Sequence, residues 1–208
     1  LTKTIRRYFL WSEPAFARRI ARSRSFGPKT KLPSGSVWLS IRPQLFIGFL
    51  APLMAKAGSD HRKYLRMVFV SVDVTAPLYW WKEYDTYKVA TVANSTSTMH
   101  KIHSKPFSMD DFSCDHMTDG TKKFMETVVA ELENIRLRFK ETKSKDDWYD
   151  MIQLLPSSYN QMRTCTFNYE TLINIYRARK NHKLAEWHTF CDWIETLPYA
   201  EQLITFEP

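Results

Sequence analysis

The sequence predicts an α/β or α+β domain, because strand-like and helix-like patterns alternate along the chain. Valines at every second position over residues 68–74 indicate a half-buried strand. Apolar residues at three- and four-residue steps over 121–141 are typical of a long amphipathic helix. The 208 residues are 44% hydrophobic and 14% aromatic, which is enough for a packed core. We expect one domain over residues 46–208, preceded by a basic N-terminal arm over 1–45.

The first predicted strand leads directly into a predicted helix over residues 78–93. Pro77 falls in its first turn, where proline is tolerated, and Thr75 is the candidate cap. Residues 94–120 are polar and contain a proline and a glycine, so they are predicted to form a long loop that could serve as a lid.

Three helical segments are predicted in the C-terminal half. In the helix over 121–141, the predicted core positions are Phe124, Val128, Leu132, Ile135 and Phe139. Ser144, with Asp147 three residues later, resembles a capping box that opens a helix ending at Pro156. A last helical region is predicted over 169–195.

The net charge of +8 is concentrated in the arm. Residues 1–42 contain ten Lys or Arg and one acid, so the remainder of the chain is close to neutral. Nucleic-acid binding through residues 1–42 is one interpretation of this charge. A solvated or partner-contacting segment is the interpretation that we favour.

Several classes of protein are disfavoured by the sequence. Three cysteines do not form a disulfide framework, and Cys165 and Cys191 are expected to be buried structural thiols. The longest apolar stretch, residues 45–53, is too short to span a membrane. The five glycines form no phosphate-binding loop, and no His or Cys grouping has metal-ligand spacing. We expect a soluble cytoplasmic protein without a metal site or a membrane contact.

Residues 68–99 carry the first part of a resemblance to a known family. The strand that ends in Ala76-Pro77, and the segment after it, resemble the strand and the Arg-His-Arg helix of flavin-dependent thymidylate synthases. With Ala76-Pro77 aligned, the Arg-His-Arg triplet falls on Thr86-Tyr87-Lys88, and a downstream serine of the family falls on Thr96. Only Lys88 keeps a positive charge in that triplet.

The second part of the resemblance lies in residues 154–187. Leu155-Pro156 and the segment 166–179 are similar to the family's Leu-Pro turn and its Asn-x-Arg-Ser-Leu-x-Asn-Phe-x-x-x-Arg helix. The matching residues are Asn168, Asn174 and Arg179, followed by Ala185-Glu186-Trp187 in place of Ala-Gln-Trp. Glu170 replaces the arginine between the two asparagines.

A histidine stretch of the family aligns upstream of the strand. Its first histidine falls on His61 and its second on Met67, so the resemblance covers about residues 58–196.

The resemblance implies a mixed sheet with long flanking helices, and methylation of dUMP to dTMP. Methylenetetrahydrofolate is then the carbon donor, FAD the hydride carrier and NADPH the reductant, in a homotetramer with active sites between subunits. Arg179 would bind and polarise dUMP as the catalytic cation. Thr96 would also contact the nucleotide, and the residues implied to contact the flavin are Asn168, Asn174, Lys88 and His61.

The residues themselves leave alternatives open. Asn168 and Arg179 are spaced to share a helix face, whereas Asn174 belongs to a second polar stripe. Two stripes fit a site assembled from more than one subunit, but they also fit a helix with one solvated face and a buried, satisfied arginine. For the aromatic cluster, an oligomer interface is favoured over stacking on a flavin. This cluster contains Tyr79, Trp80, Trp81, Tyr84 and Tyr87.

Three functions therefore follow from the sequence. The leading hypothesis is an FAD-dependent enzyme that acts on dUMP or a related pyrimidine nucleotide. The alternatives are a catalytically retired nucleotide-binding or structural homo-oligomer, and a nucleic-acid-binding protein that uses its basic arm. The retired fold is supported by Thr86, Tyr87 and Glu170, each of which removes a cation that could bind phosphate or carboxylate.

Overall fold

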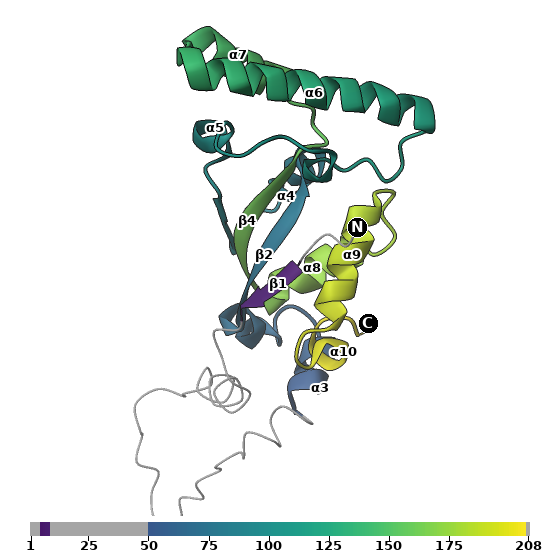
Figure 1. Cartoon of the computed structure of the whole chain (residues 1–208). Helices are drawn as coiled ribbons and strands as arrows, with labels where there is room; N and C mark the ends of the chain where they lie inside the picture. Colours follow the sequence, from purple (N-terminus) through teal and green to yellow (C-terminus); the bar gives the residue numbers. More distant parts are fainter. Residues whose placement is uncertain (1–4, 9–49, 207–208) are drawn as a thin grey trace, which may run out of the picture. The chain divides into compact units, whose positions relative to one another are not determined.

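The computed structural model describes residues 5–8 and 50–206 (Figure 1). Most of the predicted basic arm therefore lies outside the described residues. The chain divides into two compact units. The first contains residues 73–87 and 93–164, and the second contains residues 50–72, 88–92 and 165–206.

A four-stranded sheet has the order β1-β2-β4-β3 (Figure 1). The strands are β1 (Ile5–Tyr8), β2 (Phe69–Pro77), β3 (Thr91–Ser95) and β4 (Asn160–Asn168). In β2 the valines at 70, 72 and 74 are buried and the residues between them are partly exposed, which confirms the predicted strand. Strands β1, β3 and β4 are not predicted by the sequence analysis, and β1 comes from the segment predicted as the basic arm.

The helix predicted over 78–93 is wrong beyond its second turn. Helix α4 (Leu78–Tyr84) begins after Pro77, whereas Thr75 lies within β2 and is not its cap. After Tyr84 the chain turns, and Thr86 Oγ1 donates to Glu83 O at 2.7 Å. Ala90 has a left-handed φ of 56°, which no helix interior accepts, and the next residue begins β3. The segment 86–88 thus follows the helix instead of lying on it.

The aromatic residues of α4 form core, which corrects the interface interpretation for most of the cluster. Trp80, Trp81 and Tyr84 are each at most 2% exposed within the first unit. The indole Nε1 of Trp81 donates to the backbone oxygens of Ala76 and Gln161, each at 3.0 Å. These bonds satisfy the polar tip of a buried aromatic ring.

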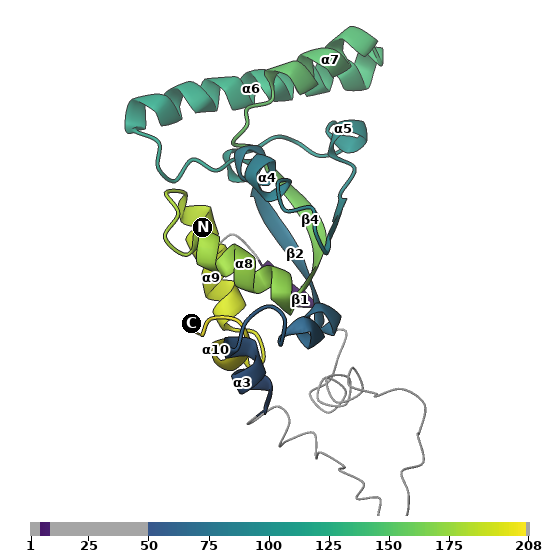
Figure 2. The same ribbon diagram turned by 180° about the vertical axis from the view of Figure 1, so that it is seen from behind.

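Two further helices of the first unit pack against each other, as Figure 2 shows: α6 (Asp119–Thr142) and α7 (Lys145–Leu154). The long helix is confirmed, but its predicted stripe is wrong at Phe124, which is 70% exposed. The residues that α6 buries are Met125, Val129, Leu132, Ile135 and Arg136. Met125 takes the place predicted for Phe124 because it joins the cluster around Ile102 and Phe112.

Ser144 caps α7 as predicted, since its side chain accepts from Asp146 N at 3.2 Å. Asp147 does not close the capping box on Ser144. Its carboxylate accepts from Thr142 Oγ1 and Arg138 Nε instead. The predicted loop 94–120 begins later, after β3, and contains a short helix, α5 (Thr98–Lys101), and a 3-10 turn, η3 (Met109–Asp111).

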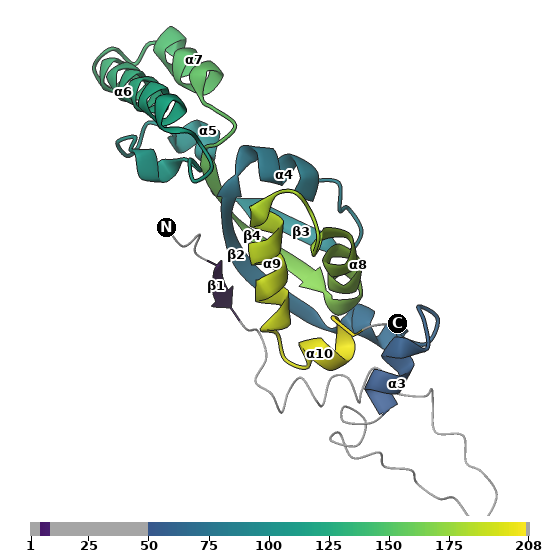
Figure 3. The same cartoon turned by 90° about the vertical axis from the view of Figure 1, so that its right-hand side faces the viewer.

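The second unit consists mainly of helices (Figure 3). Its elements are α3 (Ala51–Lys56), η2 (Lys63–Met67), α8 (Tyr169–Arg179), α9 (Ala185–Glu195) and α10 (Ala200–Leu203). The helical region predicted over 169–195 is thus two helices, separated by residues 180–184. Cys165 and Cys191 are buried, as predicted for structural thiols. Among the described residues, no helix has both the length and the apolar character needed to cross a bilayer.

Candidate functional site

The predicted site residues lie in both units. His61, Lys88, Asn168, Asn174 and Arg179 belong to the second unit, and Thr96 belongs to the first. We therefore describe the two groups separately.

Asn168 is the N-cap of α8. Its Oδ1 accepts from Thr171 N at 2.9 Å, and its Nδ2 donates to the backbone oxygen of Arg66 at 3.3 Å. The residue is 4% exposed. Both ends of the amide thus act structurally, because they start the helix and fasten it to η2. Asn168 is one of the four residues that the resemblance implies to contact flavin, and its hydrogen bonds give it a capping role.

Glu170, the residue that replaces an arginine of the family pattern, forms an ion pair with Arg62. The Nε of Arg62 lies 2.9 Å and 3.1 Å from the two carboxylate oxygens. The two side chains are only 10% and 13% exposed. The first turn of α8 therefore has an arginine beside it after all, supplied from a position 108 residues earlier in the chain.

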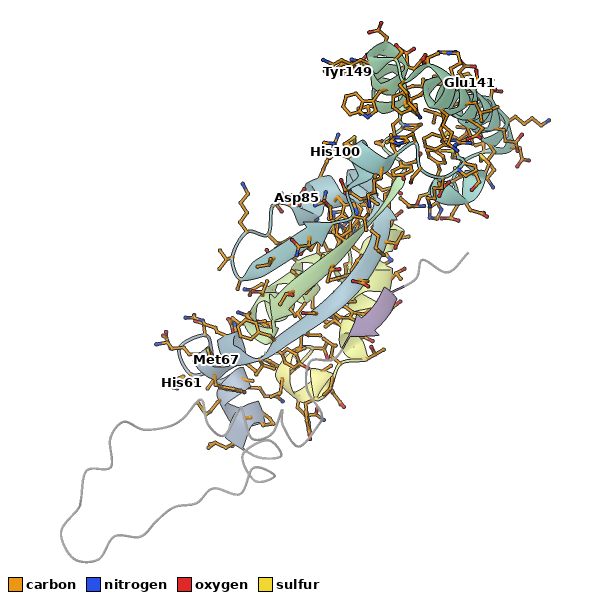
Figure 4. The ribbon with its side chains drawn as sticks, turned by 60° about the vertical axis from the view of Figure 1, so that its left-hand side comes forward. His61, Met67, Asp85, His100, Glu141 and Tyr149 are labelled. Atoms are coloured by element: carbon orange, nitrogen blue, oxygen red, sulfur yellow. The ribbon has the colours of Figure 1, made fainter. Side chains whose placement is uncertain are left out.

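Two more predicted residues lie on segments that meet this turn. Thr171 Oγ1 donates to Val89 O at 3.2 Å, which holds the loop that carries Lys88 against the start of α8. His61 immediately precedes Arg62, and both Lys88 and His61 are exposed. Figure 4 shows His61 and Met67 at the same end of the second unit. The structure thus brings the segments of His61, Lys88 and Asn168 together around one helix terminus.

Arg179 lies at the opposite end of α8. Its guanidinium carbon is 4.6 Å from the ring centroid of Trp187, a fully buried side chain of α9. The arginine is half-buried, so the contact fixes a permanent cation near the surface. Eleven residues separate it from Asn168, about 16 Å along a helix axis. One small group cannot touch both ends, although a dinucleotide could.

Asn174 lies between these two ends and is exposed. The second polar stripe is predicted to contain Glu170 and Arg177 as well as Asn174. It is only partly solvated, because Arg177 is exposed and Glu170 is mostly covered.

Thr96 lines a cavity of about 760 Å³ in the first unit. Its Oγ1 donates to Met162 O at 3.1 Å. The charged residues of the lining are Lys101, Lys105, Lys122, Asp110, Asp111 and Asp115. Lys105 forms an ion pair with Asp111 at 3.1 Å. The volume is within the range of small-ligand sites, and the three lysines of the lining are balanced by three aspartates.

The cavity also contains a cysteine and a tyrosine. Burial, and then Asp115, raise the pKa of the Cys114 thiol, and burial raises the pKa of Tyr159. Both groups are therefore protonated at neutral pH and are poor nucleophiles. Their chemistry in the cavity is that of hydrogen-bond donors. In the part of the chain that the structure describes, no group of His, Cys, Asp and Glu is arranged to hold a metal ion.

Sequence reasoning missed Arg62 and the three lysines of the cavity. Arg62 follows His61 directly, but only its pairing with Glu170 reveals it. Lys101 and Lys105 stand in the segment predicted as loop and Lys122 in the first turn of the predicted helix over 121–141, and their spacing carries no motif.

No protein-family model and no curated protein sequence matches the chain. Two solved structures of the flavin-dependent thymidylate synthase ThyX from Helicobacter pylori, both described with FAD and dUMP, are similar in fold. One has a TM-score of 0.64 at 14% identity, and the match covers 98% of each chain. The other has a TM-score of 0.54 at 17% identity and covers 74% of this chain and 80% of that one. The chain thus has a ThyX-like fold, as the resemblance predicts.

Proposed function

We propose that this protein is an FAD-dependent enzyme that methylates dUMP or modifies a closely related pyrimidine nucleotide. The observation that carries the proposal is the fold likeness to ThyX, which runs the length of both chains at 14% identity. In the full form of the proposal, methylenetetrahydrofolate donates the carbon, NADPH supplies the electrons, and the protein is a cytoplasmic homotetramer.

The donors around the first turn of α8 suit a flavin nucleotide. Lys88, His61 and Arg62 present cationic or hydrogen-bonding groups there, and a diphosphate needs several such donors. Asn168 holds the turn in place by capping it. FAD, when bound, supplies the hydride-transfer chemistry that no protein side chain provides.

Arg179 is the residue that we propose binds and polarises the pyrimidine. Its contact with Trp187 holds the guanidinium in one orientation, so little rotamer freedom is lost when a nucleotide binds. Asn174, exposed on the same helix, is a further candidate contact for flavin. Thr96, in the lining of the cavity of the first unit, is a further candidate contact for the nucleotide.

The experiment is an absorbance spectrum of the purified full chain with added FAD, followed by titration with dUMP. We expect a flavin band that shifts with dUMP in the wild type. Arg179→Ala is expected to lose the dUMP-induced shift, whereas Arg177→Ala keeps it. Arg177 is the matched control, since it is also stacked on a ring, that of Phe206 at 5.1 Å, but is exposed.

Absence of flavin binding at excess FAD would contradict the proposal. It would favour the catalytically retired alternative, which Thr86, Tyr87 and Glu170 support by lacking the family's cations. Retention on heparin that is lost with residues 1–42 would favour nucleic-acid binding through the arm.

A further inference from the structure

Arg62 uses only part of its hydrogen-bonding capacity. Its Nε donates to both carboxylate oxygens of Glu170, and no hydrogen bond or ion pair with another described residue involves its two terminal nitrogens. Those nitrogens are also not among the buried polar atoms without partners, so they reach solvent. The Arg62 side chain is therefore nine-tenths covered, while its terminal nitrogens keep some contact with solvent. Four N–H donors in a rigid fork are available there.

The surroundings of these terminal nitrogens favour an anion. The start of α8 carries the positive end of the helix dipole, and Glu170 is already paired with Arg62. Exposed His61 adjoins Arg62, and exposed Lys88 lies on the loop held by Thr171. Asp60 and Lys63, on either side of these residues in sequence, are exposed and opposite in charge.

The covered position of Arg62 makes it more than a surface cation. Glu170 fixes Nε, so the fork points in one direction before any ligand arrives, and this saves the entropy of ordering a long side chain. Phosphate oxygens match such a fork by accepting two parallel hydrogen bonds. A lysine in the same place would offer only a point charge.

We infer that Arg62 binds a phosphate group of the nucleotide ligand, and that Glu170 is the positioning residue that orients it. This inference rests on the proposed function and assigns a residue to it that the family pattern does not predict. Position 170, where the family pattern has an arginine, carries the carboxylate partner of Arg62. The phosphate belongs either to FAD or to dUMP, two sources with the same chemistry.

The test compares ligands with and without phosphate on the full-length protein. FAD and riboflavin are titrated by quenching of flavin fluorescence, and dUMP and deoxyuridine by calorimetry. In Arg62→Gln, we expect affinity for one phosphate-bearing ligand to fall at least tenfold while its phosphate-free counterpart binds as before. A loss for FAD identifies the diphosphate as the group bound, and a loss for dUMP identifies the monophosphate.

Three further variants make the result specific. Arg66→Gln, an exposed arginine of the same 3-10 turn, is the control that should bind every ligand as the wild type does. Arg62→Lys keeps the charge and is expected to lose less affinity for the phosphate-bearing ligand than Arg62→Gln does. This variant tests the inference if Arg62→Gln does not fold. Glu170→Gln is expected to lower the affinity for the phosphate-bearing ligand only.

If Arg62→Gln, Arg62→Lys and Arg66→Gln all bind FAD and dUMP with equal affinity, the inference is overturned and the proposed function still stands. A wild type that binds neither flavin nor dUMP would instead refute the proposed function itself.

Discussion

Each unit contains a covered Arg–Glu pair, and the two pairs differ in how many nitrogens of the arginine the protein hydrogen-bonds. In the first unit Arg136 uses Nε and Nη2 on Glu133 and Nη1 on His103 O, so all three of its nitrogens are engaged. Glu133 also accepts from Phe107 N at 3.0 Å. Arg62, in the second unit, has only Nε engaged among the described residues. We regard the first pair as structural and the second as prepared for a ligand.

The two pairs also differ in their origin in the sequence. Arg136 and Glu133 are three residues apart on one helix, so helix geometry alone brings them together. Arg62 and Glu170 are 108 residues apart and meet only because η2 packs on α8. The comparison teaches that burial of an arginine does not indicate its role. The number of nitrogens that the protein itself satisfies is the better indicator.

The largest expected effect is on stability in the structural pair. Arg136→Met should lower the free energy of unfolding by about 3 kcal/mol, because it leaves Glu133 without its buried partner. Arg138→Met on the same helix is the control. That arginine is 51% exposed and forms surface pairs worth about 1 kcal/mol or less. Urea denaturation followed by circular dichroism measures both, and equal losses would show that the first pair is not structural.

A smaller effect is expected at the turn that positions the second pair. Asn168→Ala should cost about 1 kcal/mol, since it removes the cap of α8 and leaves Thr171 N without its acceptor. Asn168→Asp, which keeps the acceptor oxygen but loses the Nδ2 donor to Arg66 O, should recover only part of this loss. Asn174→Ala, at an exposed position of the same helix, should be nearly neutral. Thermal unfolding distinguishes the three variants, and a wild-type melting temperature for Asn168→Ala would contradict the capping role.

The smallest effect is the pH dependence of the structural pair. Hydrogen bonding from Arg136, and then from Phe107 N, holds the pKa of Glu133 below its usual 4.5, although burial opposes them. A lowered folded-state pKa contributes stability that is present above the unfolded value and is lost as pH falls through the folded value. The stability difference between wild type and Glu133→Gln should therefore shrink as pH falls below about 4.5. Urea midpoints from pH 7 to pH 3 test this, and a difference that grows in acid would reverse our interpretation.

Local patterns predicted those elements that their own residues specify. The alternating valines of β2, the long helix α6 and the Ser144 cap are all confirmed. Strand β4 was missed because its sequence, residues 160–168, mixes polar and apolar residues without strict alternation at its start. It becomes a strand because β2 and β3 supply backbone partners on either side.

The tertiary structure also decided which residues of a correct helix are buried. Phe124 and Met125 both fit the apolar period of α6, but only Met125 faces the cluster around Ile102 and Phe112. Likewise, α4 ends at Tyr84 although the pattern predicts a longer helix. The residues after it turn, Ala90 adopts a left-handed φ, and the chain continues as the edge strand β3. The spacing of apolar residues predicts the buried face of a helix only to within one residue. The element that packs against the helix decides which of the two neighbouring residues is buried.

The sequence by itself determined the fold class, the order of motifs from His61 to Arg179, and the loss of cations at Thr86, Tyr87 and Glu170. These features follow from local periodicity and from residue identity, which need no partner. Only the tertiary structure decided that Asn168 is a cap, that Arg179 rests on Trp187, and that Arg62 stands beside Glu170. Hydrogen bonds and ion pairs depend on distances of about 3 Å between groups far apart in the chain. Those distances are fixed only when the packed elements bring the groups together.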